Sequence, residues 1–140
     1  MEDPFDLDRF LKAQASAYEQ AVAELRRGQK RSHWIWFIFP QLRGLGFSSM
    51  SGTYGIDSEA EAAAYLRHPV LGPRLLDCTR LVVETEHRSI EQIFGSVDAM
   101  KFRSSVTLFG HAAPEEPLFA QAIAKYYGGE PDDRTLEMLE

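Results

Sequence analysis

The sequence predicts a mostly α-helical fold: one compact domain over residues 1–140, with about six to eight helices and one long loop rich in glycine and serine. Three observations lead to this fold class. The length of 140 residues suits a single domain that can bury a core without disulfide bonds. Hydrophobic residues make up 44% of the chain, which argues against disorder. Apolar residues also recur at helical spacing in most segments, between recognisable caps and stops.

The first predicted helix covers residues 6–27. Its apolar side chains, from Leu7 to Leu25, recur every three or four positions, and Gly28 is a suitable C-terminal stop. Gln14 interrupts this stripe, because its position projects it into the middle of the apolar face. A buried amide without partners is costly, so we expect Gln14 to be buried and hydrogen-bonded.

The apolar run at residues 34–39 is either a buried strand or a short buried helix, and periodicity does not separate the two. Ser32 is a suitable N-cap and Pro40 a suitable stop, which favours a helix. Residues 42–56 then carry four glycines and four serine or threonine residues, and they are expected to form the long irregular loop. Loops of this length in compact domains are often functional.

The second half of the chain predicts five further helices and one short helical turn. They cover residues 59–67, 70–86, 97–109, 117–128 and a C-terminal stretch capped by Asp132 or Asp133, with the turn at residues 89–95. Ser58 and Glu61 form a capping box for the first of these helices, and Ser96 can cap the helix at 97–109. We expect the helix at 70–86 to pack on the first helix of the chain, because these two have the longest apolar faces.

Composition excludes several classes of protein. The net charge of −6 disfavours a nucleic-acid partner, because phosphate contacts require a basic surface. A single cysteine, Cys78, precludes an intrachain disulfide, and its place in an apolar stripe indicates a core residue. The four histidines are scattered, so neither a metal nor a cofactor is predicted. Without a signal peptide or a membrane-length apolar run, a cytoplasmic protein is expected.

The helix at 97–109 has the most informative polar pattern. Lys101, Ser104 and Ser105 share one face, and this strip lies between two apolar stripes. The stripes comprise Phe102, Val106 and Phe109 on one side and Val97 and Leu108 on the other. A strip bracketed in this way is partly buried or lines a cleft. The alternative is that Lys101 extends to water and that the serines bond to carbonyls of the preceding turn.

A second candidate site lies at residues 30–33. If Ser32 caps a helix, the free backbone N–H groups and the helix dipole favour an anion there, beside the side chains of Arg31 and His33. The alternative is a solvated basic turn. Trp34 and Trp36 follow directly and could stack on a base or sugar, although such a run also suits the core.

Five segments of the chain resemble one bacterial family of small, mainly helical proteins of unknown function, some of whose members are labelled calpastatin. They are residues 9–14 (RFLKAQ), 30–42 (KRSHWIWFIFPQL), 44–46 (GLG), 64–72 (AYLRHPVLG) and 98–109 (DAMKFRSSVTLF). This resemblance covers nearly the whole chain and implies a multihelical fold without an established activity. Nothing in the chain supports a protease-inhibitor role.

A second resemblance concerns the helical glycosidases that remove ADP-ribose from modified bases. Residues 68–76 and 94–98 are similar to two motifs of that family, which has a tryptophan in place of the phenylalanine found here. The Glu-His-Tyr motif of that family has no clear match, although Glu59 and Glu61 lie in the comparable region. This resemblance implies Glu59, Glu61 or Asp98 as a general acid or base.

Together these features predict a cleft that binds a small anionic, nucleotide-like ligand. The expected lining comprises Gln14, Arg31, His33, Trp34, Lys101, Ser104 and Ser105. Arg31 and His33 would hold the anion, and Lys101 would supply a second positive charge. If the protein is an enzyme, hydrolysis of an N-glycosidic bond by one of the three carboxylates is expected. The alternative is a non-catalytic protein-interaction module, with unknown partner, that exposes Trp34 and Trp36.

Overall fold

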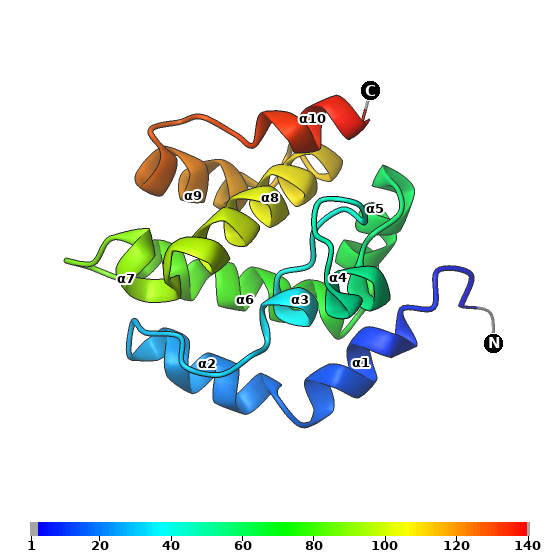
Figure 1. Ribbon diagram of the computed structural model, residues 1–140, viewed down its shortest axis with the longest axis horizontal. Coiled ribbons are helices and arrows are strands. Elements are labelled where there is room, and N and C mark those ends of the chain that lie inside the picture. The colour runs from blue at the N-terminus through cyan, green and yellow to red at the C-terminus, as the bar shows by residue number, and fades with distance from the viewer. Residues whose placement is uncertain (1–2, 140) are drawn as a thin grey trace.

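Helices form the regular structure of the computed structural model, which describes residues 3–139 (Figure 1). The predicted mostly helical fold is confirmed, since this range contains ten helices and no strand. The helices are α1 (Asp8–Ala15), α2 (Tyr18–Arg26), α3 (Ile35–Ile38), α4 (Ser49–Tyr54), α5 (Glu59–Arg67), α6 (Leu71–Glu84), α7 (Ile90–Phe94), α8 (Ser96–Ala112), α9 (Pro117–Tyr127) and α10 (Asp133–Leu139). Within residues 3–139, none is long and apolar enough to cross a membrane.

The longest helix, α8, organises the rest of the fold. It packs against α5, α7, α9 and α10, while α6 packs against α2, α5 and α9. In Figure 1, α8 crosses the middle of the molecule, α9 and α10 lie above it, and α1 and α2 run along the lower edge. Phe102 of α8 is fully buried and meets the ring of Phe39 edge-on at 4.9 Å and that of Phe94 in a stack at 5.0 Å. Aromatic packing of this kind contributes beyond the area that it buries.

The prediction of one continuous helix over residues 6–27 is wrong, because this segment forms two helices, α1 and α2, with a break between Ala15 and Tyr18. Each half then packs on a different partner: α1 contacts α3, and α2 contacts α6. The expected packing of the first helix on the helix at 70–86 is therefore correct only for its second half. The sequence hides this break, because apolar spacing continues across it.

The prediction for Gln14 is confirmed. Its side chain is 1% exposed, and its Nε2 donates to the Phe37 carbonyl at 2.7 Å and to the Tyr65 hydroxyl at 3.0 Å. Arg74 donates to the amide oxygen at 3.3 Å. Every part of this buried amide is thus satisfied, and it ties α1 to α3, α5 and α6.

The segment that was expected to be an irregular loop contains α4, which is capped by the Ser48 hydroxyl accepting from the Ser51 N–H. A parallel bridge between Leu42 and Ile56 closes the segment at its base. Two backbone hydrogen bonds of 2.9 Å, from the Arg43 N–H to Ile56 and from the Ile56 N–H to Gln41, form this bridge. The segment is therefore a closed structure with fixed ends, and only residues 43–48 remain irregular in its first half.

The other helices follow the prediction closely, with four differences at their caps and faces. The N-cap of α8 is Gly95, whereas the expected cap, Ser96, is the first residue of the helix and makes no side-chain cap hydrogen bond. The short helix α3 forms as favoured, but its N-cap is Trp34 and not Ser32. Glu61 accepts from the Asp57 N–H at 3.0 Å, so it does not complete the expected capping box with Ser58. In α8, Val97 is 65% exposed, which removes it from the predicted second apolar stripe.

The carboxylate of Glu24 is fully buried and holds the turn that joins α2 to α3. It accepts from the backbone N–H groups of Arg31 at 2.7 Å and Ser32 at 2.9 Å, and from the Ser32 hydroxyl at 2.6 Å. The indole N–H of Trp34 and the amide of Gln20 complete the set at 2.9 and 2.8 Å. Burial raises the pKa of Glu24, but these hydrogen bonds outweigh burial and hold that pKa far below its usual range.

We expect Glu24→Ala to lower the free energy of unfolding by at least about 3 kcal/mol, because it leaves several buried donors without an acceptor. Urea denaturation measures this loss. Glu19→Ala is the matched control, since Glu19 is exposed on the same helix. A loss in Glu24→Ala no larger than that of the control would contradict this account of the turn.

The depressed pKa of Glu24 also predicts how stability depends on pH. A carboxyl group whose pKa falls on folding contributes stability above its ordinary pKa of 4.5, and that contribution is lost as the pH drops toward the folded value. Wild-type protein should therefore lose stability below about pH 4.5 more steeply than Glu24→Gln. Denaturation curves between about pH 3 and pH 7 test this; parallel curves would count against it.

Candidate functional site

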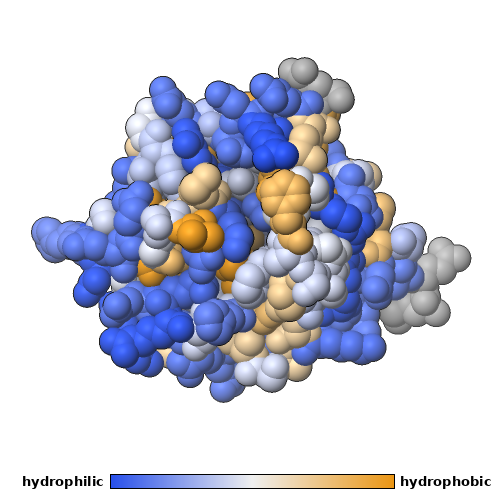
Figure 2. Space-filling model, viewed as in Figure 1, coloured by the Kyte–Doolittle hydropathy of each residue, from blue (hydrophilic) through white to orange (hydrophobic). Residues whose placement is uncertain are grey.

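A pocket of about 210 Å³ lies where three segments distant in sequence meet. Its lining comes from the loop after α3, from one face of α8 and from the start of α10. The lining residues are Gln41, Leu45, Gly46, Val97, Met100, Lys101, Ser104, Asp132 and Arg134. In the view of Figure 2, hydrophobic side chains gather around a hollow. Of the predicted ligand-binding residues, Lys101 and Ser104 line this pocket.

Lys101 is held in place by the carboxylate of Asp98, which it shares with Lys30. Its ammonium lies 3.7 Å from one oxygen of Asp98 and 4.9 Å from the centre of the Trp36 ring. The other oxygen of Asp98 lies 2.8 Å from the ammonium of Lys30, whose side chain is only 7% exposed. One carboxylate thus serves two cations, so the positive charge of Lys101 is only partly neutralised.

The sequence analysis missed Gln41. The residue is 8% exposed and lines the pocket, and its amide makes no hydrogen bond within residues 3–139 but remains accessible from the pocket. The backbone of Gln41 is fixed by the bridge at Ile56, so the amide is held at the pocket wall. The signal was present, because Gln41 ends an apolar run and the argument made for Gln14 applies to it equally.

Asp132 joins α10 to α8 at the other side of the pocket. One of its oxygens, Oδ2, accepts from the Thr135 N–H at 3.0 Å and from the Thr135 hydroxyl at 2.5 Å, and it lies 3.3 Å from the Ser104 hydroxyl. Ser104 also bonds back to the Met100 carbonyl at 3.2 Å, as the predicted alternative for this serine had it. Arg134, in the first turn of α10, is exposed and adds a second cation to the lining.

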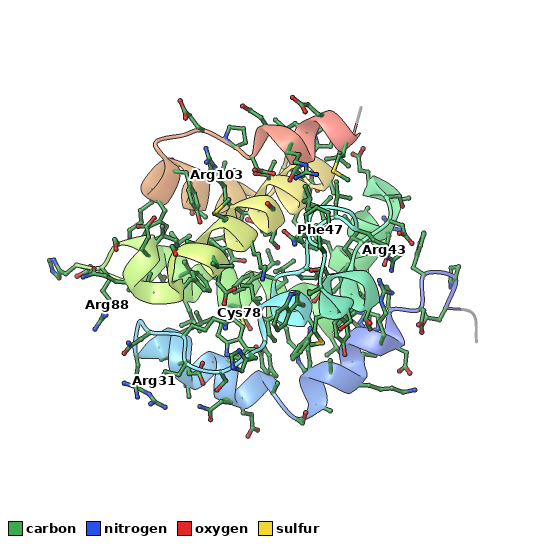
Figure 3. The ribbon with its side chains drawn as sticks, viewed as in Figure 1. Arg31, Arg43, Phe47, Cys78, Arg88 and Arg103 are labelled. Atoms are coloured by element: carbon green, nitrogen blue, oxygen red, sulfur yellow. The ribbon has the colours of Figure 1, made fainter. Side chains whose placement is uncertain are left out.

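The other predicted ligand-binding residues do not line this pocket. Arg31 and His33 are exposed on the turn after α2, and Figure 3 places Arg31 at the edge of the molecule near α2. The turn's N–H groups, expected to attract a ligand anion, donate instead to the carboxylate of Glu24. Trp34 is 1% exposed under the ammonium of Lys30, 5.0 Å from its ring, and belongs to the core.

Gln14 and Ser105 are also buried away from the pocket lining. The amide of Gln14 has the three partners described above. The hydroxyl of Ser105 is fully buried and lacks a hydrogen-bond partner among the described residues.

The three candidate acids lie in different surroundings. Asp98 lies beside Lys101, whereas Glu59 is exposed, with one oxygen 3.5 Å from His111. Glu61 is 2% exposed and forms an ion pair with Arg9 at 2.8 Å. Asp98 is therefore the only one of the three that is placed next to the pocket lining.

Arg9 and Glu61 border a larger hollow, of about 420 Å³, but this pair has no free capacity for a ligand. The Arg9 guanidinium donates to the carbonyls of Phe5, Asp6, Thr53 and Gly55 as well as to Glu61. Its role is to tie the N-terminal segment to α4 and α5.

The described residues support neither a cysteine nucleophile nor a cluster of metal ligands. Cys78 is 0% exposed, and burial raises the pKa of its thiol to about 12, which agrees with its predicted place in the core and excludes it as a nucleophile. Across residues 3–139, no three His, Cys, Asp or Glu side chains come together as metal ligands.

Because Asp98 pairs with both Lys30 and Lys101, we expect the two lysines to contribute unequally to stability. Lys30→Met should lower the free energy of unfolding by about 2 kcal/mol, because Lys30 is nearly buried and close to Asp98. Lys101→Met should cost less than about 1 kcal/mol, because Asp98 keeps Lys30 as its partner. Urea denaturation of both variants checks this. If Lys101→Met is as destabilising as Lys30→Met, Lys101 has a structural role instead.

Comparisons with known proteins place the chain in a family. A search among curated proteins finds no match. The crystal structure of the conserved hypothetical protein Rv1873 from Mycobacterium tuberculosis is 55% identical, with a TM-score of 0.97 over 98% of each chain. The sequence model described as "Protein of unknown function (DUF1810)" matches residues 4–139. The chain therefore belongs to the DUF1810 family of proteins of unknown function.

Proposed function

We propose that this protein binds a small anionic molecule, of the size of a sugar phosphate or a nucleotide, in the pocket beside Lys101. The observation that carries the proposal is the Gln41 amide, which lies at the pocket wall in a residue that is 8% exposed and makes no hydrogen bond to residues 3–139. Its amide atoms remain accessible from the pocket, so they are free to bond to a ligand or to water.

Local charge supports an anion. Lys101 and Arg134 line the pocket, and Lys30 lies behind Asp98, so that three cations stand against the two carboxylates of Asp98 and Asp132. The protein as a whole carries a net charge of −6, which makes this small excess of positive charge a local feature. Distant acidic residues oppose it weakly, since charges more than about 8 Å apart are screened at physiological salt.

Binding is better supported than the hydrolysis of an N-glycosidic bond. Of the three predicted acids, Glu59 and Glu61 do not line this pocket, and both oxygens of Asp98 face ammonium groups. A general acid must deliver a proton to the leaving group, and Asp98 in this setting faces cations on both sides. The proposal is therefore a binding protein.

The expected alternative was an interaction surface built on exposed Trp34 and Trp36. Trp34 is 1% exposed and belongs to the core, so it is not available as the centre of a protein interface. Trp36 is partly buried, and its ring lies 4.9 Å from the ammonium of Lys101, so it supports the ligand pocket as well as an interface.

Calorimetric titration with ribose 5-phosphate tests the proposal. Wild-type protein should bind it, and Lys101→Met should weaken binding by about tenfold or more, because a charge-assisted hydrogen bond is lost. Gln41→Leu should also weaken it. Lys12→Met is the matched control, since Lys12 is exposed on α1, where it pairs with Asp8. Absence of binding, or equal affinity in wild type and Lys101→Met, would rule the proposal out.

A further inference from the structure

We infer that the anion bound here is a mononucleotide, whose phosphate lies at the cationic side of the pocket and whose base lies against Phe47. The inference rests on the proposed function and adds the chemical class of the ligand. It comes from the apolar rim of the pocket, which the charges considered so far do not explain.

Exposed apolar side chains are concentrated at this one place. Five large hydrophobic residues are exposed among the described residues: Phe47, Val70, Val97, Met100 and Met138. Val97 and Met100 line the pocket itself, and Phe47 directly follows the lining residue Gly46. The Met138 methyl lies near Gly44 of the same loop. Only Val70 belongs to another part of the fold, so the clustering marks a binding surface.

Phe47 is the most exposed of the five, at 93%. It lies between two residues whose positions are fixed by α4. Gly46 packs so closely on this helix that a Cβ there would lie 2.4 Å from the Ser51 hydroxyl, and Ser48 caps the same helix. An irregular segment whose two ends are packed on α4 therefore presents the aromatic ring, and Figure 3 shows Phe47 on this loop.

The apolar rim and the positively charged side of the pocket match the base and the phosphate of a nucleotide. Apolar side chains from the loop and from α8 form the rim, while Lys101 and Arg134 provide positive charge. A flat ring on this rim would gain apolar contact from Met100, and Phe47, which follows the lining residue Gly46, is the aromatic side chain on which it would stack. A phosphate on the same molecule would then reach the cations.

The amide of Gln41 favours a base over an alkyl chain as the group that occupies the rim of the pocket. Its amide offers one donor group and one acceptor side by side, the pattern with which glutamine pairs to the edge of a base. An alkyl chain would leave this amide without a ligand partner. The pocket volume of about 210 Å³ is sufficient for a base-sized ring.

Calorimetric titration of the full chain compares the nucleotides AMP, GMP, CMP and UMP with ribose 5-phosphate, which has the phosphate but no base. At least one nucleotide should bind on the order of tenfold more tightly than ribose 5-phosphate. Phe47→Ala should abolish this difference and leave the affinity for ribose 5-phosphate unchanged, whereas Phe47→Tyr should retain it. Val70→Ala, at the exposed apolar residue outside the cluster, should change neither affinity.

Two outcomes would overturn the inference. If the nucleotides and ribose 5-phosphate bind equally, in wild type and Phe47→Ala alike, the anion site stands and the base is excluded. If ultracentrifugation without nucleotide shows a dimer that Phe47→Ala dissolves, the rim is an interface between copies of this chain. Failure of ribose 5-phosphate and all nucleotides to bind would instead remove the proposed function itself.

Discussion

The position of the pocket depends on the buried carboxylate of Glu24. By accepting from the backbone of residues 31 and 32 and from the Trp34 indole, it fixes the turn between α2 and α3 without a cationic partner among residues 3–139. That turn carries Lys30, whose N–H donates to the Ile93 carbonyl at 2.7 Å and whose ammonium reaches Asp98. Through Asp98, the turn also fixes the first part of α8, where Lys101 begins the polar face of the pocket.

Two further connections bring the remaining walls to α8. The bridge between Leu42 and Ile56 closes the segment that holds Gln41 and Gly46, so the loop wall has fixed ends. Asp132 anchors α10 through Thr135 and Ser104. Each wall is thus held by hydrogen bonds that do not use the Gln41 amide or the Lys101 ammonium, which leaves these two groups available to a ligand. Arrangements of this kind preorganise a site before a ligand arrives.

One buried polar group close to the pocket lacks a hydrogen-bond partner. The indole N–H of Trp36 is buried without a partner among the described residues, and the ring of the same residue lies under Lys101. The carboxylate beside this lysine, Asp98, is shared with Lys30. Local sequences that break the usual rules of satisfaction are most often found at functional sites, where stability is exchanged for binding.

The sequence by itself determined the helical fold and much of its local detail. Periodicity located most helices, and Gln14 was correctly predicted to be buried and satisfied, because an amide within an apolar stripe needs partners wherever the helix packs. The polar strip of α8 was recognised in the same way, and two of its three members line the pocket. The amide of Gln41 could have been found by this rule as well.

Only the tertiary structure decided which groups meet. The N–H groups at residues 31–32 were recognised as an anion site, but the anion is Glu24, from the preceding helix. Lys101 was expected to need a counter-charge. Nothing local indicated that the carboxylate of Asp98 would pair with Lys30 as well as with Lys101. The physical reason is that a local pattern shows that a buried polar group requires a partner, whereas packing between distant segments determines which partner it finds.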